Sequence, residues 1–361
     1  MEGEQSHRRV VVVGGGLAGA LLAKHLQFDA DVLLIDSKEY FEVPWARCRP
    51  MVDASFAERS LIQHTDYLSN ARVISSPAIE VSQSEVLTAE GRAFGYDYLV
   101  IATGHEDSRP RSRKERLHQF EQENEKIRTS SSVLIIGGGR TGVQLAGEIA
   151  VDYPEKKVTL VHEGSRLLQF LGPKASEKAL KRLRSKLVEV LLDQSVNLNS
   201  TTNGDGVFTT SAGRSVSADC HFVCGGRPLS SSWLKQTMLE DKLDRFGRLM
   251  VEGNLRVRGL KNVFAIGSII DITDKQGCLA YKHAAVAAKN IKLLLKGGKE
   301  EKLALYKPSS SLAFVSLGRK VAVVQFSFTT VSGHIPGLFT SKDLFVKWNR
   351  KQMGLEAHII S

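Results

Sequence analysis

The fold is decided by Val10-Val11-Val12-Val13-Gly14-Gly15-Gly16-Leu17-Ala18-Gly19, a β-branched run followed by a complete G-x-G-x-x-G motif. The run predicts a buried strand, and a helical pattern begins directly after the glycines. In this motif Gly14 allows a tight turn, Gly16 lets the backbone approach a pyrophosphate, and Gly19 lets the helix pack closely on the strand. The free N–H groups at the helix N-terminus would then bind the phosphates. We therefore expect Gly14 to Gly19 to hold a dinucleotide.

An acidic residue stands where this kind of fold needs one. A second run, Asp31 to Ile35, predicts the neighbouring strand and delivers Asp36, 22 positions after Gly14. A carboxylate at that distance accepts hydrogen bonds from an adenosine ribose. The alternative is a glycine-rich turn in an α/β unit without a cofactor, which the strand, the helix and the acid together disfavour.

The same pattern occurs a second time. Val133 to Ile136 is followed by Gly137-Gly138-Gly139-Arg140-Thr141-Gly142, a helical pattern and a strand-like run from Val158 to Val161. This strand ends in His162-Glu163, so Glu163 is a displaced candidate for the ribose contact. His162 suits either a ribose or a 2′-phosphate, and the sequence therefore leaves NADH and NADPH open.

Three further buried runs end in small residues. They are Tyr98 to Gly104, ending in Thr103-Gly104; Cys220 to Pro228, containing Gly226; and Asn262 to Ser268, ending in Gly267-Ser268. Small residues at the C-terminal end of a strand let the backbone lie against a flat ligand or let the chain cross between domains. We expect these ends to border the two glycine loops.

Charge and cysteine content narrow the class of protein. The 361 residues carry 49 Lys and Arg against 39 Asp and Glu, and the net charge of +10 suits nucleic acid, an anionic membrane surface or an acidic partner. The charge-dense segment 109–128 is expected to be a solvated connection. The four cysteines form neither a disulfide framework nor a metal-binding pattern. We expect a reducing compartment, the cytoplasm, and no metal site.

The two glycine motifs, with Ala102-Thr103-Gly104 before the second and Val263 to Gly267 after it, resemble the two-dinucleotide-binding flavoprotein superfamily. The ending, with Leu317-Gly318-Arg319 and Ser341 to Val346, resembles the branch of apoptosis-inducing-factor-like proteins that includes the ferroptosis suppressor flavoprotein. This resemblance implies FAD in the first unit and NADH or NADPH in the second. It also implies hydride passed through the flavin to a quinone-type acceptor, as in type II NADH dehydrogenases.

We therefore predict an α/β protein with two Rossmann-like dinucleotide-binding domains and a small C-terminal α+β segment. The FAD domain is expected at 1–107 and 247–296, and the NAD(P)H domain at 108–246. The C-terminal segment, 297–361, is expected to pack against the FAD domain on the acceptor and membrane side.

The resemblance also assigns roles to single residues. Arg49 falls where the branch places an arginine on the FAD, and Glu148 matches a helix glutamate that turns toward the nicotinamide. An ordinary solvent-facing carboxylate is the alternative for Glu148. The superfamily has an Asp directly after its Ile-Gly pair, whereas this chain has Ser268. We expect FAD to be held weakly, unless Asp271 takes over that contact.

The acceptor side is expected at Ala280-Tyr281-Lys282-His283, which matches the segment that lines the quinone approach in type II NADH dehydrogenases. Tyr281 and His283 would contact the acceptor or supply protons to it. In the tail, apolar residues are interleaved with cations: Leu338, Phe339, Leu344, Phe345 and Trp348 with Lys342, Lys347, Arg350 and Lys351. This mixture favours an anionic membrane surface, and a packed core with a solvated rim is the alternative.

The sequence thus predicts an FAD-dependent NAD(P)H:quinone oxidoreductase in the cytoplasm with peripheral membrane contact. Two other functions stay open: a reductase for a protein or for a radical such as monodehydroascorbate, and a signalling or nucleic-acid-binding flavoprotein. The cations are spread without stacking aromatics, which disfavours nucleic acid. After Asp36 the chain has only Cys48 before Cys220, so no thiol relay is expected. The identity of the quinone and the oligomeric state stay open.

Overall fold

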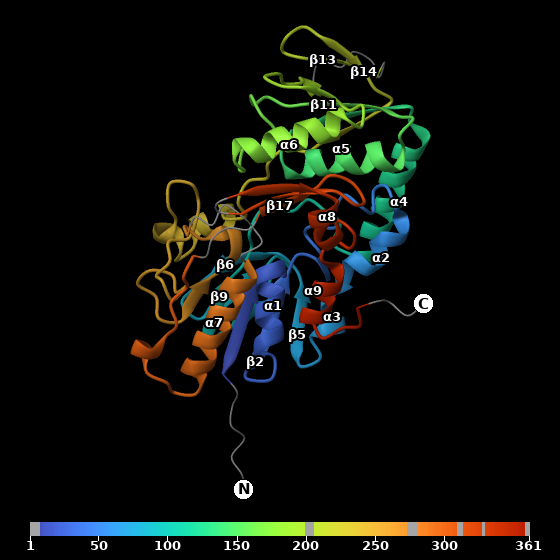
Figure 1. The fold of residues 1–361 in the computed structure, drawn as a ribbon. Helices are drawn as coiled ribbons and strands as arrows, with labels where there is room; N and C mark the ends of the chain where they lie inside the picture. Colours follow the sequence, from blue (N-terminus) through green and yellow to red (C-terminus); the bar gives the residue numbers. More distant parts are fainter. Residues whose placement is uncertain (1–7, 199–205, 273–279, 309–312, 327–328, 358–361) are drawn as a thin grey trace.

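The computed structural model describes residues 8–198, 206–272, 280–308, 313–326 and 329–357. Two units of sheet and helix lie one above the other, and the C-terminal elements pack beside both of them (Figure 1). Cys278 and the rest of 273–279 lie outside the described residues.

The first unit contains a parallel sheet in the order β16-β9-β1-β2-β5. Its strands are β1 (Arg9–Val13), β2 (Asp31–Asp36), β5 (Ala71–Ser75), β9 (Tyr98–Ile101) and β16 (Val263–Ala265). Two largely apolar helices, α1 (Leu17–Leu26) and α7 (Ala280–Leu295), pack against each other. Because β16 and α7 come from far down the chain, this unit is built from two separate segments.

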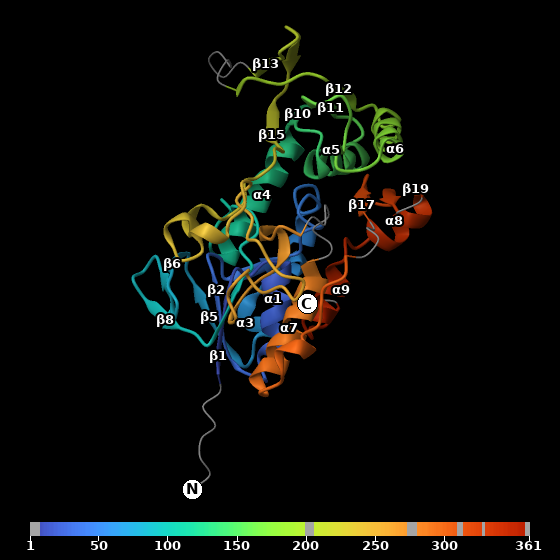
Figure 2. The same ribbon diagram turned by 90° about the vertical axis from the view of Figure 1, so that its left-hand side faces the viewer.

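The second unit contains a parallel sheet in the order β12-β11-β10-β15. Its elements are β10 (Ser132–Ile136), α5 (Arg140–Asp152), β11 (Lys157–Val161), α6 (Pro173–Arg184), β12 (Glu189–Leu191), the hairpin β13 (Val207–Thr209) and β14 (Ser215–Ser217), and β15 (Cys220–Val223). The chain enters this unit through α4 (Arg113–Thr129), which is visible between the two units in Figure 2. Ser112 caps α4, since its Oγ accepts a hydrogen bond from the Glu115 N–H at 3.2 Å.

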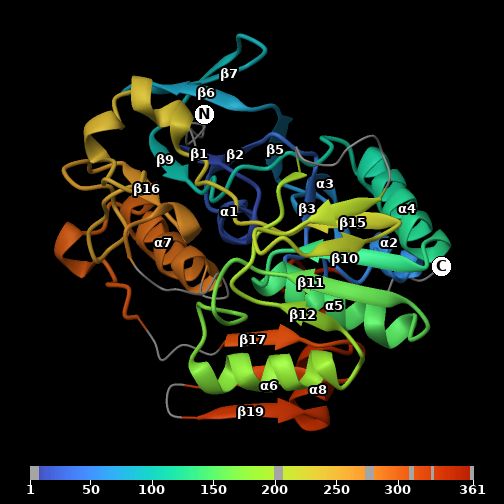
Figure 3. The same cartoon turned by 90° about the horizontal axis from the view of Figure 1, so that it is seen from above.

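The C-terminal segment begins as a small antiparallel sheet, β17 (Ala313–Ser316), β18 (Ala322–Gln325) and β19 (Thr330–Gly333). This sheet packs on α5 and α6 of the second unit, as Figure 3 shows from above. Two short helices follow, α8 (His334–Thr340) and α9 (Val346–Gln352), and Leu344 and Val346 join the core of the first unit. The segment therefore bridges both units, whereas the sequence predicted packing against the FAD domain alone.

Shorter elements complete the first unit. They are β3 (Tyr40–Glu42), α2 (Ala57–Ser60), β4 (Leu61–Gln63), α3 (His64–Tyr67), β6 (Ala78–Val81), β7 (Glu85–Thr88) and β8 (Ala93–Gly95). Among the described residues, no helix has the length and apolar character needed to cross a membrane.

Candidate active site

The first glycine loop has the geometry that its motif predicts. Gly14 has a φ of +103°, and a Cβ there would lie 2.6 Å from the carbonyl oxygen of Ala102. A Cβ on Gly19 would lie 1.9 Å from the carbonyl oxygen of Gly14, so α1 can approach the end of β1 only because Gly19 has no side chain. Around Gly16 no heavy atom of the described residues lies within 4 Å of a Cβ position, which leaves its backbone open to a ligand.

Asp36 ends β2 and is buried beneath this loop. Its Oδ2 accepts a hydrogen bond from the Gly15 N–H at 2.8 Å and lies 3.4 Å from His64 Nε2, while its Oδ1 lies 3.4 Å from Lys38 Nζ. Burial alone would raise the pKa of this carboxyl, but Lys38 and His64 outweigh it and hold the pKa well below its usual range. Asp36 is therefore an ionised acceptor, fixed at the position predicted for a ribose contact.

One cavity of about 860 Å³ runs along the carboxyl ends of the first sheet. Its walls include Gly14 to Ala18, Asp36, Thr103-Gly104 and Gly267-Ser268, all of which were predicted to lie at a cofactor. A cavity of this size holds a cofactor, and the open backbone of the loop with the α1 N-terminus suits a pyrophosphate. The residues present therefore fit FAD.

Ser268 lines this cavity where the superfamily has an Asp. Asp271 does not line it: its Oδ1 accepts a hydrogen bond from the Val251 N–H at 3.0 Å, and its Oδ2 lies 3.2 Å from Arg258 Nη2. The alternative that Asp271 takes over the contact of the missing acid is disfavoured, because its carboxylate already holds Val251 and Arg258.

The second glycine loop repeats the backbone geometry of the first at the corresponding glycines. Gly137 has a φ of +116°, and a Cβ there would lie 2.6 Å from the carbonyl oxygen of Cys224. A Cβ on Gly142 would lie 1.8 Å from the carbonyl oxygen of Gly137, and around Gly139 the described residues again leave open space. The second unit therefore presents the same phosphate-binding geometry at the N-terminus of α5.

The predicted contacts around the second loop are arranged differently. The ring of His162 packs against the loop, since a Cβ on Gly138 would lie 2.7 Å from its Cδ2, whereas Glu163 is exposed. The guanidinium of Arg140 donates a hydrogen bond to the carbonyl oxygen of Phe314 and so contacts the C-terminal segment. His162 and Glu163 stay candidates for the ribose or 2′-phosphate.

Arg49 and Glu148, which the sequence assigned to different cofactors, form one buried ion pair. Arg49 Nε and Nη2 donate to the two carboxylate oxygens of Glu148 at 2.8 and 2.9 Å, and both side chains are at most 1% exposed. Arg49 Nη2 also donates to the carbonyl oxygen of Ser341 at 2.9 Å. Burial raises the pKa of Glu148 although Arg49 opposes the shift. The pair thus joins the first unit, α5 and the C-terminal segment, and Glu148 does not face solvent.

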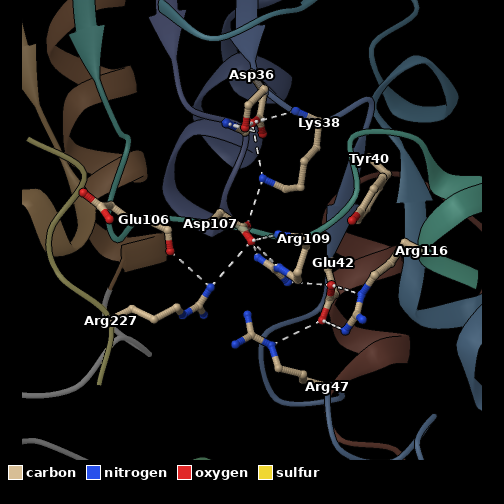
Figure 4. A network of polar contacts seen from close by, with 12 residues as sticks. Asp36, Lys38, Tyr40, Glu42, Arg47, Glu106, Asp107, Arg109, Arg116 and Arg227 are labelled. Atoms are coloured by element: carbon tan, nitrogen blue, oxygen red, sulfur yellow. Dashed lines mark hydrogen bonds and ion pairs between the residues drawn. The ribbon is translucent and has the colours of Figure 1, made fainter. Parts of the chain in front are cut away.

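An ionic network lines one wall of the cavity and was missed in the sequence (Figure 4). At one end Glu42 Oε2 lies 2.5 Å from Arg109 Nη1 and 3.2 Å from Arg116 Nε, and its Oε1 lies 3.4 Å from Arg47 Nε. Burial would raise the pKa of Glu42, but the three arginines lower it to about 2. The expectation of a solvated segment is therefore wrong for Arg116, which is buried, and for Arg109, which is paired and lines the cavity.

At the other end of the network, Asp107 ties together the two chain crossings between the units. Its carboxylate pairs with Arg109, lies 3.1 Å from Lys38 Nζ and 3.6 Å from Arg227 Nη1 (Figure 4). Burial and the nearby Arg47 and Arg109 lower the pKa of Arg227 to about 10. Gly226, next to Arg227, is exposed in the crossing that leads from β15 back to the first unit.

The two residues predicted for the acceptor side differ in their surroundings. Tyr281 is partly exposed, and its ring meets the edge of Trp348 with centroids 5.6 Å apart. His283 is 3% exposed, and its Nδ1 accepts a hydrogen bond from the Gly267 N–H at 3.2 Å. His283 therefore contacts the backbone at the FAD cavity, which favours a positioning role over contact with an acceptor.

The apolar tail divides into a packed half and an exposed half. Leu344 is 1% exposed, and Phe345 packs on Trp45 and Phe314, with ring centroids 5.4 and 4.7 Å apart. Leu338 and Phe339 on α8 are instead 58% and 79% exposed. Leu344 and Phe345 therefore belong to a packed core, as the alternative to a membrane surface predicted. The membrane interpretation is limited to α8 and its surroundings.

The cysteines of the described residues, Cys48, Cys220 and Cys224, are free thiols. Burial raises the pKa of Cys48 well above its usual value, so this thiol is a poor nucleophile. In the described ranges no cluster of His, Cys, Asp and Glu could hold a metal ion.

Two dinucleotide folds, one with a cavity that fits FAD and one with a second open glycine loop, define a flavoprotein reductase that takes its electrons from a nicotinamide nucleotide. The chain belongs to the pyridine nucleotide-disulphide oxidoreductase family, whose model matches residues 8–290. Its cofactors are FAD and NAD(P)H, and the predicted fold class and family resemblance are confirmed.

Similar proteins cover nearly the whole chain. Apoptosis-inducing factor homolog B of Dictyostelium discoideum is 31% identical, over 94% of this chain and 95% of that protein. Ferroptosis suppressor protein 1 of Homo sapiens is also 31% identical, over 97% of both chains. The branch indicated by the C-terminal residues is therefore the right one.

Two solved structures show the same fold at low sequence identity. The sulfide:quinone oxidoreductase of Aquifex aeolicus has a TM-score of 0.76 at 18% identity and covers 97% of this chain and 93% of its own. The structure of NDH2 from Plasmodium falciparum in complex with NADH has a TM-score of 0.68 at 13% identity, covering 96% and 97%.

Proposed function

We propose that this protein is an NAD(P)H:quinone oxidoreductase. The observation that carries the proposal is the junction at Arg49 and Glu148, where the FAD unit, the nucleotide unit and the C-terminal segment meet in one buried contact. When bound, FAD would accept a hydride from a nicotinamide nucleotide and pass two electrons on to an acceptor. A quinone takes both electrons without a thiol intermediate, and this chain has only Cys48 in the first part of the FAD unit.

The protein's own residues position the two nucleotides. The first loop and the α1 N-terminus bind a pyrophosphate, while Asp36, ionised and fixed by the Gly15 N–H, accepts from ribose hydroxyls. The second loop and α5 do the same for NADH or NADPH, with His162 and Glu163 at the adenosine end. His283 holds the Gly267 backbone, and Tyr281 borders the acceptor side.

Electrostatics around the cavity support this assignment over nucleic-acid binding. Glu42 pairs with Arg47, Arg109 and Arg116, so two of the cations of 109–128, Arg109 and Arg116, are engaged at or near the FAD cavity rather than on an open basic surface. The apolar residues Val331, Ile335, Leu338 and Phe339 of β19 and α8 are exposed, and Leu338 lines a cavity together with the exposed Lys320 and Lys342. We propose that this face contacts an anionic membrane, where long-chain quinones reside, from the cytoplasmic side.

A steady-state screen of electron acceptors tests the proposal. With NADH in excess we expect turnover with short-chain and long-chain quinones, and with long-chain quinones an increase when anionic vesicles are present. Turnover only with a protein carrier or with the monodehydroascorbate radical would replace the quinone assignment. Salt-dependent DNA binding without turnover would favour the signalling alternative.

A further inference from the structure

A second cavity, of about 420 Å³, shares no residue with the FAD cavity. It lies where α8 meets the turn between β17 and β18. The residues that line it are Arg49, Arg319, Lys320, Gly337, Leu338 and Lys342. Four of these six residues are cations, and none is an acid.

The two arginines of this cavity are already paired. Arg319 Nη2 lies 2.6 Å from Asp152 Oδ2, and its Nη1 lies 2.8 Å from Asp53 Oδ2. Arg49 uses Nε and Nη2 for Glu148 and the Ser341 carbonyl, which leaves Nη1 as a donor. The arginines therefore add hydrogen-bond donors to the cavity more than they add net charge.

The two lysines supply the net charge. Lys320 and Lys342 are exposed, and neither forms an ion pair with any of the residues that the structure describes. Two ammonium groups thus face one cavity without a carboxylate to balance them. Such an arrangement favours an anion, because each ammonium gains a charged acceptor.

The backbone fixes the two lysines relative to each other. A Cβ on Gly337 would lie 2.1 Å from the carbonyl oxygen of Lys320, so α8 packs directly on the turn that carries this lysine. Next to Lys342, the Ser341 hydroxyl donates to the carbonyl oxygen of Val321 at 2.9 Å. The cavity is therefore preformed at the level of the backbone.

We propose that this cavity binds a phosphate group. A phosphate offers several charged oxygens to a compact set of donors, which matches two flexible ammonium groups and one remaining guanidinium nitrogen. The phosphate belongs either to a soluble phosphate ester or to the headgroup of a phospholipid. In the second case the exposed side chains of Leu338, which lines the cavity, and of its neighbour Phe339 could contact the acyl chains. This site goes beyond the quinone reductase activity and does not depend on it.

Calorimetric titration with inorganic phosphate tests the site in the full chain loaded with FAD. NAD⁺ is present throughout, so that both glycine loops are filled. We expect saturable binding that weakens about tenfold or more when Lys320→Glu and Lys342→Glu are combined, since two charge-assisted contacts are lost. The matched control combines Lys347→Glu and Lys351→Glu on α9, which changes the charge equally and should leave binding nearly unchanged.

Sedimentation with vesicles separates the two sources. Binding to phosphatidylcholine vesicles that contain phosphatidic acid, lost in the Lys320/Lys342 variant and competed by inorganic phosphate, identifies a lipid headgroup. Phosphate binding without vesicle binding identifies a soluble ester. Absence of saturable phosphate binding, or equal losses in the two double variants, would overturn the proposal. If the charge-reversed variant does not fold, Lys320→Gln with Lys342→Gln makes the same comparison.

Discussion

The two glycine loops are nearly identical in backbone, yet the acids that accompany them differ. Asp36 is 6% exposed and held by the Gly15 N–H and Lys38, whereas Glu163 is exposed. Because the Asp36 side chain is already fixed, little side-chain entropy is lost when the ligand binds, which suits a cofactor that stays bound. An open acid suits a nucleotide that must leave after each turnover. We propose that the end of the second strand in each unit is where one fold is adapted to a resident and to an exchanging ligand.

The largest effect is expected from substitution of Arg49, where the two units meet. Arg49→Ala leaves Glu148 buried and unpaired, which should cost about 3–5 kcal/mol of unfolding free energy. Chemical denaturation of the FAD-loaded protein measures the loss. Combining Arg49→Met with Glu148→Leu removes both charges and should recover most of the stability. A single variant as stable as the parent would show that the pair does not join the units.

The corresponding glycines sharpen the comparison. Gly19→Ala and Gly142→Ala each force a Cβ to within 2 Å of a loop carbonyl oxygen, at 1.9 and 1.8 Å, and overpacking of this kind costs about 1–3 kcal/mol. We expect Gly19→Ala to lose FAD, measured by the flavin absorbance per protein. Gly142→Ala should keep FAD and lose reduction by NADH. The same defect in both variants would mean that the loops do not bind different ligands.

Ser268 tests how tightly the first unit holds its cofactor. The cavity has a hydroxyl where the superfamily has a carboxylate, and Asp271 is engaged elsewhere. A lost contact with a charged group costs about 1.5–3 kcal/mol, so Ser268→Asp should raise FAD affinity roughly tenfold or more. FAD content after dialysis measures this. Full occupancy in both proteins would show that another group already makes the contact.

The smallest effect is expected at the exposed acid of the second unit. If Glu163 accepts from the adenosine ribose, Glu163→Ala should raise the KM for NADH by roughly fivefold, about 1 kcal/mol, and that for NADPH less. The reason is that a carboxylate binds ribose hydroxyls but repels a 2′-phosphate. Equal changes for both nucleotides would exclude Glu163 from this contact.

Local signals predicted the fold and both loops. The strands before Gly14 and Gly137 and the helices after the two glycine motifs lie where hydrophobic pattern and glycine spacing place them. Such features are predictable because each depends on neighbours within a few positions of the chain.

Contacts between distant residues were not predictable in the same way. Arg116 and Glu42 are 74 positions apart, and Arg49 and Glu148 are 99 apart, so no spacing rule relates them. In the sequence, Arg109 and Arg116 belong to a run of charges typical of a solvated segment. Composition alone does not show that folding places Glu42 next to them. The tail shows the same limit, since Leu344 and Leu338 are equally apolar and only packing decides that one is buried.

Anaerobic absorbance of the purified protein tests the central claim most directly. That claim is that the first unit holds FAD, the second takes NADH or NADPH, and a quinone removes the electrons. We predict that NADH bleaches the flavin bands without oxygen and that a short-chain quinone then restores them. Flavin bands that NADH leaves unchanged, or that stay bleached after the quinone is added, would contradict the account.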